Sequence, residues 1–150
     1  MTYLTYRPAV DADLPFIIDI YNSNIEALHG ELRSFERWLE IFHSGSEYYI
    51  VENSAAVAWF RIDAEEDILD LAMVQVSPEH QHMGIGRFIV ESFEKIAKEK
   101  VFHNLVIHTT EDNIPARSLY LKCGYEVTEI NDCTTADGAT RIGYTFEKKI

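Results

Sequence analysis

The sequence predicts a single α/β domain with a mixed, mostly antiparallel sheet of six or seven strands and about four helices. An apolar run (68–76), a helical run (86–99) and a β-rich run (104–110) follow one another, an order that favours a right-handed parallel crossover. Strand-like runs joined by short turns precede them, which favours antiparallel pairing. With 150 residues, 47% of them hydrophobic, and no shift in composition, the chain fits one domain over residues 1–150.

The first third of the chain reads as one strand and two helices. Residues 3–7 alternate aromatic and β-branched side chains and end at Pro8, as a strand does. Asp11 or Asp13 is suited to cap the next helix, and Ser34 to cap a second one. The side chains spaced to face the core are Leu14, Ile17, Ile18 and Tyr21 in the first helix and Phe35, Trp38, Leu39 and Phe42 in the second.

Three strands follow as an antiparallel meander. Runs 48–52 and 55–62 are joined by the turn residues Asn53 and Ser54, and an acidic turn (64–67) leads into the strand 68–76. The segment 23–33 between the two early helices is either loop or irregular helix. Loops on a rigid scaffold often determine specificity, so its candidates for contacting a substrate amine, if they are not simply solvated, are Glu26, His29 and Glu31.

The second half predicts two more helices and three more strands. Helix 86–99 has an apolar face formed by Ile85, Phe88, Ile89, Phe93, Ile96 and Ala97, and the opposite face spaces Glu91 with Lys95 and Glu94 with Lys98 for ion pairs. Asn113 is suited to cap a helix that runs to Cys123 and stops at Gly124. Strands 125–130 and 141–148 close the chain across a loop with the turn pair Asp137 and Gly138.

The passage from strand 68–76 into helix 86–99 is suited to bind phosphate. The strand breaks at Ser77 and Pro78, and the helix begins at Gly84 and Gly86, where free backbone N–H groups and the helix dipole favour an anion. A dinucleotide fingerprint would need a small residue at position 89, and a P-loop would need Lys followed by Ser or Thr after its last glycine. Both patterns are missing, so the alternatives are another kind of phosphate loop or a plain strand-to-helix turn.

Two motifs decide between these alternatives. Gln81-x-x-Gly84-x-Gly86 resembles the acyl-CoA pyrophosphate loop of the GNAT N-acetyltransferase family. The stretch from Asn113 through Ala116 and Tyr120 to Gly124-Tyr125 resembles the second signature of that family, and residues 6–9 and 13–14 are similar to its opening. The resemblance spans essentially the whole chain and implies a GNAT-like fold in which the two central parallel strands splay apart.

The resemblance also implies the cofactor and its site. Acetyl-CoA would lie in the splay, with CoA as product, and its pantetheine arm would pair with backbone groups of one splayed strand. The residues that the resemblance and the nearby cations assign to the cofactor are Val74, Val76, Gln81, His82, Met83, Gly84, Ile85, Gly86, Arg87, Asn113 and Arg117.

The reaction implied is acetyl transfer to the primary amine of a small, cationic molecule by direct attack on the thioester. Tyr120 matches the general-acid tyrosine of the family, which protonates the departing thiolate. Asp70 falls at the position of the glutamate base in the histone-acetylating branch but is one methylene shorter, so His108, Glu111 and a water chain stay open as alternatives. Acetylation of a protein lysine or N-terminus, and a non-catalytic acyl-CoA sensor, are the alternative functions.

Net charge and cysteine content limit which partners and which cellular compartment are expected. A net charge of −12 argues against nucleic acid and either favours a cationic substrate or serves solubility alone. The sequence has no membrane-spanning run and no signal peptide, and Cys123 and Cys133 lack disulfide or zinc spacing. We therefore expect a cytoplasmic protein with free thiols and no membrane partner. We expect no metal at His80 and His82, and the resemblance implies a homodimer.

Overall fold

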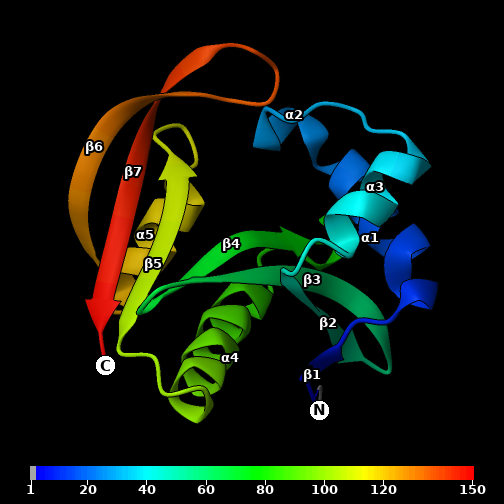
Figure 1. The fold of residues 1–150 in the computed structure, drawn as a ribbon, viewed down its shortest axis with the longest axis horizontal. Helices are drawn as coiled ribbons and strands as arrows, with labels where there is room; N and C mark the ends of the chain where they lie inside the picture. Colours follow the sequence, from blue (N-terminus) through cyan, green and yellow to red (C-terminus); the bar gives the residue numbers. More distant parts are fainter. Residues whose placement is uncertain (1–2) are drawn as a thin grey trace.

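The computed structural model describes residues 3–150 as seven strands and five α-helices (Figure 1). Two short 3-10 turns, 11–13 and 78–80, precede α1 and α4. The helices are α1 (Leu14–Ser23), α2 (Ile25–Leu28), α3 (Phe35–Phe42), α4 (Ile85–Glu99) and α5 (Ile114–Lys122). The strands are β1 (Thr5–Pro8), β2 (Glu47–Asn53), β3 (Ala55–Glu65), β4 (Ile68–Val76), β5 (Asn104–Thr110), β6 (Glu126–Thr134) and β7 (Thr140–Lys149). The α/β class is confirmed.

The strands form one mixed sheet in the order β1-β2-β3-β4-β5-β7-β6. Strands β1 to β4 are an antiparallel meander, as expected, and β4 pairs with β5 in parallel through the crossover helix α4. Strand β7 inserts between β5 and β6, antiparallel to both. Segment 23–33 contains both of the expected forms, since the short helix α2 is followed by an extended loop.

Two apolar clusters cover the two faces of the sheet. Helix α4 packs Ile89, Phe93 and Ala97 against one face, where Tyr120 of α5 joins them. On the other face, α1 and α3 cover only β2 to β4, and neither of these two helices lies over β5, β7 and β6 (Figure 1). Each buried aliphatic or aromatic side chain contributes about 1.5–3 kcal/mol, so these faces hold the helices in place.

Three details of the predicted helices are wrong. Phe35, in the first turn of α3, is 52% exposed, and Trp38 is the α3 side chain that is fully buried in the core. Glu91 accepts from Arg87 at 3.2 Å rather than from Lys95. Glu94 accepts from the Tyr125 hydroxyl and from Lys148 instead of Lys98, because α4 lies against the end of β7.

Strands β4 and β5 separate halfway along their length (Figure 1). Their parallel register ends at Leu71 and Ile107. At the same level Arg61 of β3 faces Met73 and Ile62 faces Leu71, which leaves Ala72 as an unpaired bulge residue. A bulge bends its strand and increases the local twist, so β4 turns away from β5 there. The splay implied by the resemblance is confirmed.

No helix within residues 3–150 is long and apolar enough to cross a membrane.

Candidate functional site

A cleft of about 840 Å³ opens where β4 and β5 diverge. We call it the main cleft. Its walls come from the end of β4, the loop before α4, the first turn of α4, the α1–α2 junction and one face of α5. Nine of the eleven residues expected to contact a cofactor line it, namely Val74, Val76, Gln81, His82, Gly84, Ile85, Gly86, Arg87 and Asn113.

The loop into α4 presents free backbone donors to the main cleft. His82 at φ 64° and Gly84 at φ 81° turn the chain sharply into the helix. The first helical hydrogen bond joins the Phe88 N–H to the Gly84 carbonyl at 3.1 Å. Within residues 3–150, no acceptor takes the N–H groups of residues 85, 86 and 87. These donors at the positive end of the helix dipole form a cradle for an anion.

The two glycines of this loop serve different purposes. Gly84 has the left-handed backbone that glycine tolerates, and a Cβ there would meet nothing within 4 Å. Gly86 is helical, and its Cβ would lie 3.1 Å from the Leu119 side chain of α5. The missing side chain at position 86 therefore lets α4 and α5 approach closely at the wall of the main cleft.

The edge of β4 that is not paired with β3 faces the main cleft. The Ser77 N–H donates to the Val57 carbonyl of β3 at 3.0 Å, so by strand alternation Val76 and Val74 direct their backbone groups away from β3. The Val76 carbonyl already accepts from Asn24 Nδ2 at 2.9 Å and from Gln81 Nε2 at 3.3 Å. The Val76 N–H and both groups of Val74 are left for a ligand.

Asn24 joins three parts of the site, and sequence reasoning missed it. Its Nδ2 donates to Gln75 Oε1 at 3.1 Å as well as to the Val76 carbonyl, and its Oδ1 accepts from Gln81 Nε2 at 3.1 Å. Gln75 is 1% exposed, so its oxygen depends on this donor. The only available signal was an asparagine next to the end of α1, a position at which asparagine is ordinary.

Helix α5 faces the main cleft with Pro115, Ala116, Leu119 and Lys122, one helical stripe. Its cap is as expected, because Asn113 Oδ1 accepts from the Ala116 N–H at 3.3 Å. Arg117 lies off this stripe, where its guanidinium donates to the Glu111 carbonyl and stacks 4.2 Å from the Tyr144 ring centre. The second cation of the main cleft is therefore Lys122, which the 3.6-residue period would have indicated.

Met83 and Tyr120 lie outside the lining of the main cleft. Met83 is 66% exposed at the tip of the loop. Tyr120 is 6% exposed, beneath the wall formed by Ala116 and Leu119, with its ring edge-on to Phe146. Burial raises the pKa of Tyr120 to about 12, so its phenol keeps its proton at neutral pH and can donate it.

A second cavity of about 390 Å³ adjoins the main cleft and shares Ala27, Leu28 and Asn113 with it. We call it the side pocket. His108 lines it, together with residues of β6 and β7. The His108 Nε2 atom is 3.6 Å from Asp70 Oδ2, and its Nδ1 is 3.2 Å from Thr145 Oγ1. Burial raises the pKa of Asp70, although the nearby His108 opposes this shift.

The other substrate candidates are not brought together. His29 Nε2 contacts Asp112 Oδ2 at 2.6 Å, and the His29 carbonyl accepts from the Asp137 N–H at 3.0 Å. His29 thus ties the 23–33 segment to the loops after β5 and β6. Glu26, Glu31 and Glu111 are exposed and line neither cavity.

Both cysteines are free, as expected. Burial raises the pKa of the Cys123 thiol, which disfavours the nucleophilic thiolate. Among residues 3–150, no group of three or more His, Cys, Asp or Glu side chains is arranged to hold a metal ion.

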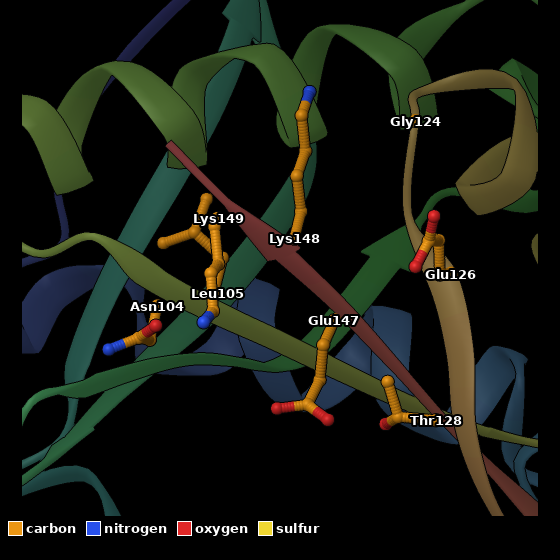
Figure 2. Close-up of a pocket in the computed structure, with 8 residues that line it drawn as sticks. All are labelled: Asn104, Leu105, Gly124, Glu126, Thr128, Glu147, Lys148 and Lys149. Carbon is orange, nitrogen blue, oxygen red and sulfur yellow. The ribbon is translucent and has the colours of Figure 1, made fainter.

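A hollow of about 460 Å³ lies at the other end of β5 (Figure 2). Figure 2 shows Glu147 and Lys148 on opposite sides of β7, with the lysine directed toward α4. Lys148 Nζ is occupied there by Glu94 and by the Cys123 carbonyl. The hollow lacks the free helix donors of the main cleft.

Comparison with known proteins agrees with this geometry. A family model described as "Acetyltransferase (GNAT) family" matches residues 14–125. A curated relative, the mycothiol acetyltransferase of Arthrobacter sp. (strain FB24), is 38% identical over 56 residues, which are 37% of this chain. The match spans only 17% of that relative's length.

Solved structures share the fold over nearly the whole chain. The spermidine N-acetyltransferase of Vibrio cholerae, solved in complex with CoA and spermine, has a TM-score of 0.84 at 20% identity and covers 97% of this chain and 95% of its own. The ribosomal-protein-alanine N-acetyltransferase of Brucella melitensis has a TM-score of 0.82 at 22% identity, with 97% and 99% covered. At these identities the likeness is one of fold.

Proposed function

The chain belongs to the acetyltransferase (GNAT) family, and from this premise we propose that it transfers an acetyl group from acetyl-CoA to the primary amine of a small cationic molecule. The observation that carries the proposal is the main cleft, in which an anion cradle, a free strand edge and two cations meet at the point where the central strands diverge.

The main cleft offers a group for each part of acetyl-CoA. The pyrophosphate fits the free N–H groups at the start of α4, with Arg87 and Lys122 as counter-charges. The pantetheine arm, an extended chain with two amides, fits the free backbone groups of Val74 and the Val76 N–H in the manner of an added strand. The thioester then points toward the end of the β4–β5 pairing, between Leu71 and Ile107.

The chemistry is direct attack of a neutral amine on the thioester carbonyl. The C–N bond forms, the oxyanion is held by a β4 backbone N–H near Val74, and the C–S bond breaks. Tyr120 protonates the departing thiolate, because the family motif assigns this role to it and Ala116 and Leu119, its neighbours on α5, line the main cleft. Asp70 assists removal of the proton from the amine on the opposite face of the sheet.

The side pocket is the proposed acceptor site. It adjoins the main cleft at the level where the thioester would lie, and its volume suits a small molecule. The net charge of −12 attracts a cation and repels nucleic acid, which we propose is not a partner. The spermidine acetyltransferase neighbour, solved with spermine, supports an amine acceptor of this class.

The test is release of CoA thiol from acetyl-CoA by the purified protein against separate pools of polyamines, aminoglycosides, amino acids and lysine or N-terminal peptides. We expect release with a small-amine pool and a loss of about 10²-fold or more in kcat for Tyr120→Phe, with unchanged acetyl-CoA affinity. Release only with peptides would instead assign a protein acetyltransferase. Saturable CoA binding without release in any pool would assign a sensor domain.

We further propose that the enzyme works in the cytoplasm as a homodimer. Its two free cysteines suit a reducing compartment. Light scattering on the purified protein measures the mass directly, and a monomer at micromolar concentration would contradict the dimer.

A further inference from the structure

On the sheet face opposite α4, an imidazole and a carboxylate face one another where β4 and β5 diverge. His108 Nε2 and Asp70 Oδ2 are 3.6 Å apart, which is too far for a direct hydrogen bond. The other carboxylate oxygen, Asp70 Oδ1, is buried and accepts no hydrogen bond from any residue in 3–150. The Asp70 side chain is nevertheless 29% exposed, so Oδ2 is the oxygen that a ligand can reach.

The fold places this pair at the reacting centre. Ile107 is the last β5 residue in register with β4, so His108 is the first beyond the point of divergence. Leu69, Leu71, Leu105 and Ile107 are buried under α4, so strand alternation puts Asp70 and His108 on the opposite face. On that face His108 lines the side pocket, together with Ala27 and Leu28 of α2.

The partner that fits this pair is an ammonium group. Thr145 Oγ1 lies 3.2 Å from His108 Nδ1, and a proton on Nδ1 donated to this hydroxyl leaves the lone pair on Nε2, beside Asp70. An ammonium nitrogen can lie within hydrogen-bond distance of both Nε2 and Oδ2, because two contacts of about 2.9 Å span a gap of this width. A neutral hydroxyl donor would not balance the carboxylate charge.

Resting on the proposed acetyl transfer, we propose that His108 takes the proton from the acceptor ammonium, that Asp70 binds this ammonium, and that Thr145 positions the imidazole. The ammonium gives one proton to His108, and the neutral amine attacks as the C–S bond breaks. Tyr120 protonates the thiolate and recovers the second amine proton, so one proton leaves through His108 to solvent. Glu111 is exposed, and within residues 3–150 no side-chain contact joins it to His108 or Asp70, so it is not part of this pair.

The charged groups around this pair favour a cationic ligand. Asp70 faces His108 from β4, and Asp63 and Arg61 lie on the neighbouring strand β3. On the same face, β7 contributes Glu147 and β6 contributes Glu129, the register partner of Thr145. The sum of these charges is acidic, which attracts an ammonium group.

The experiment compares kcat/KM profiles against pH for His108→Gln, Asp70→Asn and Thr145→Val, with His43→Gln as control. His43 forms an exposed pair with Asp11 at 2.8 Å, far from both cavities. We expect His108→Gln to lose about 10²-fold or more near neutral pH and to recover as the pH approaches the pKa of the amine. Asp70→Asn should raise the KM for the amine, because it removes the charge that binds the ammonium. Thr145→Ser should restore the activity that Thr145→Val loses, and His43→Gln should match the wild type.

Acetyl-CoA affinity, measured by calorimetry, should be unchanged in every variant, which separates loss of the base from loss of folding. Added imidazole should restore turnover in His108→Ala. A His108→Gln enzyme with the wild-type rate across the pH range would overturn the inference and leave a water chain as the route for the proton. If the wild type released no CoA thiol with any amine, the proposed function itself would fail, which is a different result.

Discussion

Replacing Asn24 by alanine tests whether the α1–α2 junction stabilises the end of β4 and the loop that follows it. The substitution removes the donor to Gln75 Oε1, an acceptor in a side chain that is 1% exposed. An orphaned buried acceptor costs about 1–3 kcal/mol, and the lost bond to the Val76 carbonyl adds about 0.5–1.5 kcal/mol. We therefore expect a loss of about 2–4 kcal/mol in the free energy of unfolding, or roughly 5–15 °C in Tm.

The same variant should weaken cofactor binding only modestly. Gln81 loses its acceptor on Asn24 but keeps the Val76 carbonyl, so the dissociation constant of CoA should rise by at most about tenfold. Urea unfolding gives the stability, and calorimetric titration with CoA gives the affinity. Asn22→Ala is the matched control, because Asn22 is exposed at the end of the same helix.

A double variant isolates the contact with Gln75. Removing both polar partners of a buried hydrogen bond is nearly neutral, so Asn24→Ala combined with Gln75→Leu should be less destabilised than the two single losses added together. A cost below about 0.5 kcal/mol for Asn24→Ala alone, the range of ordinary surface substitutions, would refute the reasoning, because it would mean that Gln75 finds another donor.

Three further outcomes are expected. Gly84→Ala should cost about 1–2 kcal/mol in urea unfolding through its left-handed backbone alone, since a Cβ there meets open space; no measurable loss would contradict this. Lys122→Ala should raise the dissociation constant of CoA and weaken its dependence on salt concentration, whereas Arg117→Ala should change neither quantity. Equal effects of the two substitutions on CoA binding would contradict the placement of Lys122, rather than Arg117, at the main cleft. Hydrogen bonding from Arg7 lowers the pKa of Asp13, so the ion pair contributes its full stabilisation above the ordinary carboxyl pKa of about 4 and loses it as the pH falls through the lowered value. In Asp13→Asn, the free energy of unfolding should therefore fall less steeply at acid pH than in the wild type. Parallel curves of unfolding free energy against pH for the two proteins would argue against this.

Local signals in the sequence were sufficient for most of the fold. Periodicity identified α4 and its buried face, and turn residues located the hairpins, because these patterns depend on backbone preferences over a few residues. The loop from Gln81 to Gly86 and the cap at Asn113 were equally local, and both lie in the main cleft. The helical period also relates Lys122, rather than Arg117, to the stripe of α5 that lines the main cleft, and the assignment of Arg117 to the cofactor stays a prediction.

Contacts between distant residues were decided only by the tertiary structure. The bulge at Ala72 sets where β4 leaves β5, and it depends on how β3 twists against β4 rather than on any residue preference. Asn24 meets Gln75 across 51 positions, and His108 meets Asp70 and Thr145 from three strands. The sequence alone determined the elements, the family likeness and the loop from Gln81 to Gly86. The point at which β4 leaves β5, the hydrogen bonds of Asn24 and the His108–Asp70 pair arose from packing, because strand register and twist bring together side chains that no local pattern relates.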